Sequence, residues 1–98
     1  MESKNIRENV SEVIDGDTFY TDNRKRKHPI RLANVDAPEK GDPGFAQATK
    51  ELEKLISEKE VMIEQVARDK YGRPVAKVKI GNKSVNKAMQ EYLKKLKK

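Results

Sequence analysis

Two short acidic segments, Asp15-Gly16-Asp17-Thr18 and Asp36-Ala37-Pro38-Glu39, stand out in a chain that is otherwise strongly basic. Ionised carboxylates are the oxygen ligands that a hard cation such as Ca²⁺ takes in proteins. Arg31 and Arg73 carry the planar guanidinium group that binds phosphate oxygens through paired hydrogen bonds. Carboxylates for a metal and arginines for a phosphate together predict a site for phosphodiester chemistry.

The composition favours one small domain and a polyanionic partner. The chain has 98 residues, of which 39% are charged and 35% apolar, so we expect a single domain over residues 1–98 with one small core. The net charge of +6 favours binding to nucleic acid, because neutralising phosphates releases condensed counterions. A basic surface that only keeps the protein soluble is the alternative.

Several classes of protein are excluded or disfavoured. The chain has no cysteine, which excludes disulfides and thiolate metal sites, and a single histidine makes a zinc site untenable. Residues 1–9 lack the apolar run of a secretory signal, and no segment is long enough to span a membrane. We therefore expect no membrane partner, a cytoplasmic location if the sequence is full-length, and a monomer. A secreted protein whose signal had been removed would look the same.

The first half of the chain predicts strands. Apolar residues from Val10 to Val35 come in short runs separated by turn residues, which predicts three strands. Asp15-Gly16 predicts a hairpin turn, because glycine tolerates a positive φ. Arg24–Lys27 is a basic tip between the second and third strands, either a solvated loop or a flap that attracts phosphate.

The second half adds two helices and two strands. Asp42-Pro43 predicts a helix start, Ser84 predicts the cap of a final helix, and residues 61–66 and 75–80 predict strands. Three strands, a helix, two strands and a helix are too few strands for a sandwich. The order predicts an α+β, mainly β fold: a five-stranded Greek-key barrel of the oligonucleotide-binding (OB) kind with two packed α-helices.

Four motifs in this order resemble the staphylococcal (micrococcal) nuclease family. They cover nearly the whole domain, and although each alone is weak, all four on a matching layout of strands and helices are specific. The motifs are Val13-Ile14-Asp15-Gly16-Asp17-Thr18; Ile30-Arg31-Leu32 with Val35-Asp36-Ala37-Pro38-Glu39; Asp69-Lys70-Tyr71-Gly72-Arg73; and Val85-Asn86-Lys87-Ala88.

The resemblance implies a Ca²⁺-dependent nuclease that acts on DNA and RNA and leaves 3′-phosphate ends. It places Asp17 and Asp36 where the family's metal carboxylates lie. Ala37 falls where the family enzyme has a threonine that gives calcium its main-chain carbonyl, which alanine also has. Glu39 matches the glutamate that activates or orients the attacking water, while Arg31 and Arg73 match the two phosphate-binding arginines.

Three further residues each have two possible interpretations, one functional and one structural. By resemblance, Lys70 and Tyr71 contact the terminal phosphate of a bound nucleotide; otherwise they simply precede the turn at Gly72. Asp15 is either an outer-shell residue near the metal or a hairpin turn residue. Thr18 is interpreted as a structural hydroxyl.

The predicted site conflicts in one respect with the regular alternation of side chains along a strand. Strict alternation along a strand puts Arg31 on the face opposite Asp36, so both reach one pocket only if the strand twists or ends near Val35.

The chain also departs from the family pattern. The loop 40–44 is short, and the chain stops at Lys98, before the family enzyme's last helix and its base-stacking tyrosines. We therefore expect weaker binding of the base. A catalytically weak nucleic-acid-binding OB-fold module is the alternative function, and a purely structural scaffold would not explain the retained acids.

Overall fold

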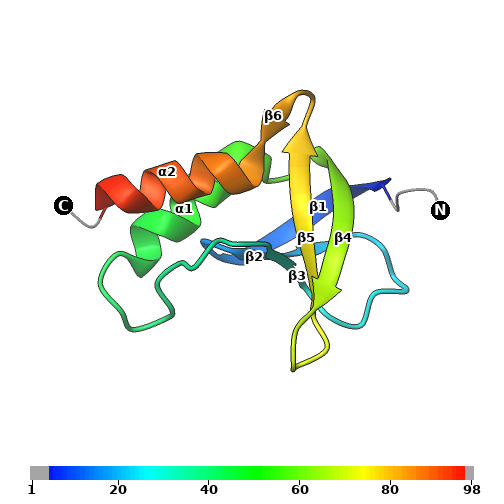
Figure 1. The fold of residues 1–98 in the computed structure, drawn as a ribbon, viewed down its shortest axis with the longest axis horizontal. Coiled ribbons are helices and arrows are strands. Elements are labelled where there is room, and N and C mark those ends of the chain that lie inside the picture. The colour runs from blue at the N-terminus through cyan, green and yellow to red at the C-terminus, as the bar shows by residue number, and fades with distance from the viewer. Residues whose placement is uncertain (1–4, 97–98) are drawn as a thin grey trace.

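The fold is a small barrel with two helices against it (Figure 1). The computed structural model describes residues 5–96. In chain order the elements are β1 (Asn5–Asp15), β2 (Thr18–Thr21), β3 (Ile30–Leu32), α1 (Phe45–Ile56), β4 (Glu60–Arg68), β5 (Pro74–Ile80), β6 (Lys83–Ser84) and α2 (Val85–Leu96).

Strands β1 to β5 close on themselves. The antiparallel pairs are β1 with β2, β2 with β3, β1 with β4 and β4 with β5. The barrel is closed by a short parallel pairing of β3 with β5, in which Arg31 is opposite Val75 and Leu32 is opposite Ala76. The two-residue strand β6 adds only to β5. This arrangement confirms the predicted α+β, mainly β fold with a five-stranded OB-type barrel.

Strand β1 is longer than the sequence predicted. Its first half, Asn5–Asn9, pairs with Glu60–Glu64 of β4, and its second half pairs with β2. Irregularities in the β1–β2 register accompany the second pairing, and such irregularities let a strand bend. One strand therefore belongs to both halves of the barrel, and the predicted start at Val10 was too late.

The helices cover one side of the barrel. Helix α1 packs against β1, α2 packs against β5, and the two helices contact each other (Figure 1). Among the described residues, the largest fully buried side chains of the shared core are those of Phe19, Ile30, Leu32, Leu52, Ile56, Ile63 and Met89. Within residues 5–96, neither helix has the length and apolar character needed to span a bilayer.

The helix starts agree only in part with the sequence prediction. Ser84 Oγ accepts a hydrogen bond from the Lys87 N–H at 3.1 Å, which confirms the predicted cap of α2. Asp42, by contrast, does not cap α1. The N-cap is Gly44, whose φ of 87° is left-handed, and no side chain caps this helix. The Asp42 carbonyl instead accepts from the Phe45 N–H at 3.2 Å.

Gly16 forms the predicted hairpin turn for a different reason from the one expected. Its φ is not among the positive values of the described glycines. A Cβ at this position would lie 2.8 Å from the Cβ of Ala37 and 2.8 Å from that of Ala48. Glycine is therefore required here by close packing, because the hairpin presses against both the second acidic segment and α1.

Candidate active site

Asp17 lies in the turn between β1 and β2, and its carboxylate joins the two acidic segments. The residue is only 7% exposed. Its Oδ1 accepts a hydrogen bond from Thr18 Oγ1 at 2.7 Å, and its Oδ2 accepts one from the Ala37 N–H at 3.0 Å. Thr18 is thus a structural hydroxyl, and the Asp17 carboxylate is fixed next to the backbone of Ala37.

Arg31 lies between the two aspartates. Its Nη2 is 3.5 Å from Asp17 Oδ2 and 3.9 Å from Asp36 Oδ1, although the side chain of Asp36 is fully exposed. Strand β3 ends at Leu32, one residue after Arg31, so strict alternation no longer applies when the chain reaches Asp36. The early end of β3 resolves the conflict that alternation posed.

Helix α2 holds the segment that leads to Asp36. Asn86 Nδ2 donates to the carbonyls of Ala33 at 2.9 Å and Ala76 at 3.0 Å, and Asn86 Oδ1 accepts from the Val78 N–H at 2.8 Å. These three bonds satisfy the buried amide group. The sequence motif Val85-Asn86-Lys87-Ala88 contained Asn86, but no role was predicted for it. An amide side chain beside the apolar stripe of a helix is the signal that could have indicated a buried structural role.

A second side chain of α2 reinforces this anchor. Gln90 Nε2 donates to the carbonyl of Asn34 at 2.8 Å, and Asn34 has a left-handed φ of 60°. Asparagine tolerates that conformation better than most residues. The chain therefore reverses direction at Asn34, and the hydrogen bond from Gln90 of α2 holds this turn in place. Gln90 is a positioning residue that was not predicted from the sequence.

Arg73 is oriented by Asp69 across the turn between β4 and β5. Asp69 Oδ1 accepts from the Tyr71 and Arg73 N–H groups at 3.0 and 2.9 Å, and Oδ2 accepts from Arg73 Nε at 2.7 Å. Desolvation raises the pKa of Asp69, but these hydrogen bonds outweigh it and hold the pKa below its ordinary value. Gly72 completes the turn with a φ of 87°. An aspartate four residues before an arginine, with glycine between, is the signal that could have predicted this pair.

Lys70 and Tyr71 lie on the same turn, but only Tyr71 is among the described residues that line the pocket containing Arg73. Tyr71 is 67% exposed and lines the pocket that contains Arg73. Lys70 Nζ is 5.4 Å and Arg73 Cζ 5.6 Å from the centre of the Tyr71 ring, within the range of a cation–π contact. Lys70 itself is not among the described residues that line the pocket.

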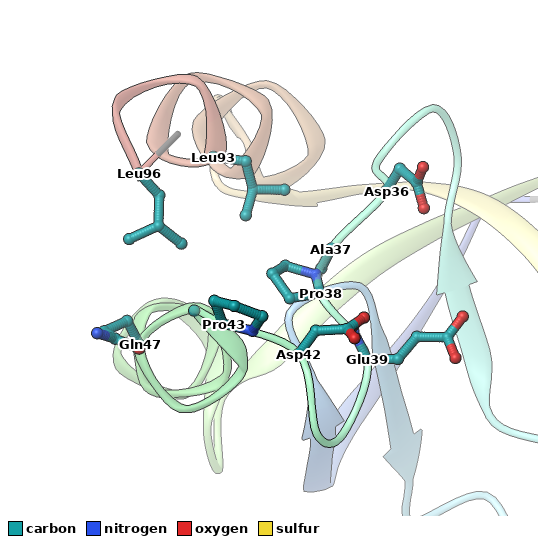
Figure 2. A pocket seen from close by; sticks show the side chains of 10 residues that line it. Asp36, Ala37, Pro38, Glu39, Asp42, Pro43, Gln47, Leu93 and Leu96 are labelled. Atoms are coloured by element: carbon teal, nitrogen blue, oxygen red, sulfur yellow. The ribbon is translucent and has the colours of Figure 1, made fainter. Parts of the chain in front are cut away.

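Glu39 lies on the exposed loop between β3 and α1. Its backbone N–H donates to Asp42 Oδ2 at 3.2 Å, so the loop is fixed independently of the Glu39 carboxylate. Figure 2 shows the carboxylates of Asp36 and Glu39 extending from this loop. On the other side of the loop, Pro38 lies near Leu93 and Leu96 of α2 across a hollow of about 670 Å³. Neither Arg31 nor Arg73 is among the described residues lining that hollow.

One open pocket of about 520 Å³ brings the predicted site residues together. Its described lining contains eight of the nine site residues predicted from the sequence, together with Lys40, which was not predicted. The eight are Asp15, Asp17, Arg31, Asp36, Ala37, Glu39, Tyr71 and Arg73. Carboxylates from the β1–β2 turn and from the β3–α1 loop therefore share this pocket with the guanidinium groups of Arg31 on β3 and Arg73 on the β4–β5 turn.

Asp15 occupies the crowded acidic side of this pocket. Burial, together with the neighbouring Asp17 carboxylate, raises the pKa of Asp15 to about 6. Its Oδ1 also accepts the Asp17 N–H at 3.0 Å, which is the hydrogen bond of a turn residue. The structure thus shows the turn role of Asp15 and places its carboxyl beside Asp17.

The donor set of the pocket fits a hard cation held by few protein ligands. Asp17 and Asp36 each have an oxygen within 4 Å of the same Arg31 nitrogen, and Asp17 is hydrogen-bonded to the backbone of Ala37. The carboxylates of Asp17 and Asp36 offer oxygen atoms, which are the ligands that calcium prefers. Among residues 5–96, however, no three acidic or histidine side chains gather closely enough to enclose an ion. Water and other ligands would have to supply most of the coordination.

The barrel and this pocket together define an OB-type domain with a carboxylate and arginine site. A family model described as Staphylococcal nuclease homologue matches residues 29–92. The chain therefore belongs to the staphylococcal nuclease family, as the sequence motifs indicated.

Individual relatives agree with this family. The chain is 36% identical over 69 residues to an uncharacterized endonuclease of Escherichia coli O157:H7, covering 70% of this chain and 45% of the relative. It is 33% identical over 73 residues to a micrococcal nuclease of Shigella flexneri, covering 74% and 42%. A thermonuclease of Staphylococcus intermedius is 33% identical over 85 residues, covering 79% and 51%. The chain thus spans about half the length of these curated relatives or less.

Proposed function

We propose that this domain is a calcium-dependent nuclease that hydrolyses phosphodiester bonds of DNA and RNA and leaves 3′-phosphate ends. One observation carries the proposal: Arg31, Arg73, Asp17, Asp36 and Glu39 all line one open pocket. The names of the relatives, which include endonuclease, micrococcal nuclease and thermonuclease, support the same activity.

The two arginines bind the phosphate. Arg31 approaches from β3 and Arg73 from the β4–β5 turn, where Asp69 holds its Nε. This leaves the terminal nitrogens of Arg73 for phosphoryl oxygens, on which negative charge builds up during hydrolysis. Calcium, when bound to Asp17, Asp36 and the Ala37 carbonyl, would supply further positive charge to the same oxygens.

Glu39 accepts the proton of the attacking water. Its exposed carboxylate lies on the loop that carries Asp36 and lines the same pocket. A carboxylate within one water of the phosphorus can act as a general base. The water oxygen forms a bond to phosphorus, the bond from phosphorus to the 5′ oxygen breaks, and the leaving oxygen takes a proton from solvent.

Cleavage of end-labelled DNA and RNA oligonucleotides by the purified protein tests this proposal. We expect cleavage with calcium, no cleavage with EDTA, and products whose mass shows a 3′-phosphate. Asp36→Asn is the matched control, because it removes the negative charge of a proposed metal ligand at a fully exposed position, where the change has little effect on folding. A folded protein that binds both oligonucleotides and cuts neither would instead be a nucleic-acid-binding module.

A further inference from the structure

A second pocket of about 480 Å³ lies between the β2–β3 loop and β4. Lys25, Lys27, His28 and Arg68 line it, and among its described lining residues there is no carboxylate. This composition is opposite to that of the candidate active site, where four carboxylates line the pocket. A basic pocket without acid attracts a phosphate anion.

The loop that forms this pocket is held in place by a buried carboxylate. Glu8 is 8% exposed, and its two oxygens accept from Arg26 Nε at 2.7 Å and from Arg26 Nη2 at 3.0 Å. Thr21 Oγ1 and Asn23 Nδ2 donate to the same carboxylate at 2.7 and 2.9 Å. Glu8 therefore neutralises Arg26 and fixes the loop, while Lys25 and Lys27 are exposed.

The second pocket adjoins the turn that carries Arg73. A Cβ on Gly72 would lie 3.3 Å from His28 Nε2, and Arg68 Nη1 donates to the Gly72 carbonyl at 2.8 Å. Figure 1 shows the β2–β3 loop and the β4–β5 turn near the end of β4 and β5 that is remote from α2. Arg73 and Tyr71 of this turn thus line the candidate active site, whereas Arg68 at the end of β4 and His28 of the β2–β3 loop line the second pocket.

We infer that this second pocket binds another phosphate of the same nucleic acid strand, away from the phosphate that is cut. The inference rests on the proposed nuclease function. Lys25, Lys27 and Arg68 supply the charge, and Ile6, at 45% exposure, adds apolar surface beside them for a sugar or base. The strand crosses the β4–β5 turn between the two pockets.

Affinity for single-stranded oligonucleotides of increasing length, from about 2 to about 12 nucleotides, measured in EDTA to prevent cleavage, tests the inference. The parent should show a step in affinity once the strand reaches the second pocket. The triple variant Lys25→Gln, Lys27→Gln and Arg68→Gln should lack that step and bind the longest strand about 10-fold more weakly. Its log affinity should also depend less steeply on log salt, by about 0.7 for each phosphate that the variant no longer neutralises.

The matched control is the triple variant Lys50→Gln, Lys83→Gln and Lys87→Gln. It removes the same charge from exposed positions on α1, β6 and α2, and it should keep the step. If both triple variants bind the longest strand equally, net charge alone explains binding and the second pocket is not a phosphate site.

Inorganic phosphate is a second probe, read by NMR at the amides of residues 24–28 and 72. Shifts with oligonucleotide that disappear in the first triple variant support the strand path. Shifts with inorganic phosphate but no length step would mean that the pocket binds free phosphate, which overturns the inference. A parent that binds no oligonucleotide in EDTA and cuts none in calcium contradicts the proposed function itself, whereas a parent that cuts oligonucleotides in calcium but lacks the step contradicts only the second pocket.

Discussion

The backbone N–H of Ala37 donates to Asp17 Oδ2 at 3.0 Å, so the first acidic segment holds the second one in place. The same carboxylate accepts from Thr18 Oγ1 through its other oxygen. Asp17 therefore combines a structural role with its proposed role at the metal. Asp36, whose side chain is fully exposed, has no comparable structural bonds among residues 5–96.

The two aspartates should therefore respond differently to substitution. Asp17→Ala leaves a buried hydroxyl and a backbone N–H without their acceptor, and should lower the free energy of unfolding by about 1–3 kcal/mol. Asp36→Asn should change it by no more than about 0.5 kcal/mol while slowing calcium-dependent cleavage by at least ~10²-fold. Urea unfolding in EDTA and cleavage rates in calcium measure the two effects. Equal decreases in stability would show that the Asp17 hydrogen bonds are not structural.

Asp69 should act through Arg73. Asp69→Asn retains an oxygen for the Tyr71 and Arg73 N–H groups but removes the charged acceptor of Arg73 Nε. We expect kcat to fall by about 10-fold or more, because a misplaced guanidinium no longer meets the phosphate. Arg73→Lys, which lacks the planar fork, should cost at least ~10²-fold.

A double-mutant cycle distinguishes this coupling from an independent effect. Once Arg73 is lysine, Asp69→Asn should slow cleavage little further, because its partner is gone. Fully multiplicative effects in the double variant would mean that Asp69 does not work by orienting Arg73.

Glu39 should be separable from stability. Its carboxylate is exposed, and the loop bond to Asp42 uses its backbone N–H. Glu39→Gln removes the proton acceptor but keeps the shape, so the variant should melt no lower than the parent without calcium and cut at least ~10²-fold more slowly. A melting temperature well below the parent's would identify Glu39 as structural, and parental cleavage would exclude it from the mechanism.

The decrease in the free energy of unfolding at acidic pH should depend on Glu8. Burial opposes its ionisation, but the hydrogen bonds from Arg26, Thr21 and Asn23 outweigh burial and hold its pKa below the ordinary value of 4.5. A lowered pKa in the folded state gives stability that is fully present above pH 4.5 and is lost as the pH falls through the folded pKa. At pH 7, Glu8→Gln should lower the free energy of unfolding by about 1–3 kcal/mol, and the difference should shrink as the medium becomes more acidic.

Glu12→Gln is the control for this effect, since Glu12 is exposed on the same strand. It should leave the pH profile of urea unfolding unchanged. If Glu8→Gln and Glu12→Gln give the same profile, the buried contact with Arg26 contributes nothing measurable to acid stability.

Much of the fold was predictable because side-chain periodicity and turn residues indicate most of the elements. The alternation in residues 75–80 and the cap at Ser84 both correspond to observed structure. The first half of β1 could not be found in this way. Asn5–Asn9 contains one apolar residue, Ile6, and that residue is exposed. Its place in the barrel depends on main-chain pairing with β4, which leaves no hydrophobic pattern in the sequence.

In the site, too, features that depend on local sequence were predictable, whereas features that depend on tertiary packing were not. The motifs identified the residues that line the pocket, because acids and arginines are chemically distinctive. The supports of those residues were harder to recognise: Asn86 and Gln90 act on backbone carbonyls from a distant helix. Gly16 looked like a turn glycine, yet its requirement comes from Ala37 and Ala48, which only tertiary packing brings close.

The parallel pairing of β3 with β5 has a consequence for the order of folding. Arg31 enters the pocket from one side of this seam and Arg73 from the other, and the seam joins residues far apart in the chain. Contacts of such long sequence separation carry a large loop-closure cost. An intermediate with an open seam would already hold Arg31 beside Asp17, because β3 also pairs with β2, but Arg73 would not yet face them. Recognition of a phosphate by both arginines should therefore be among the last properties a refolding chain acquires.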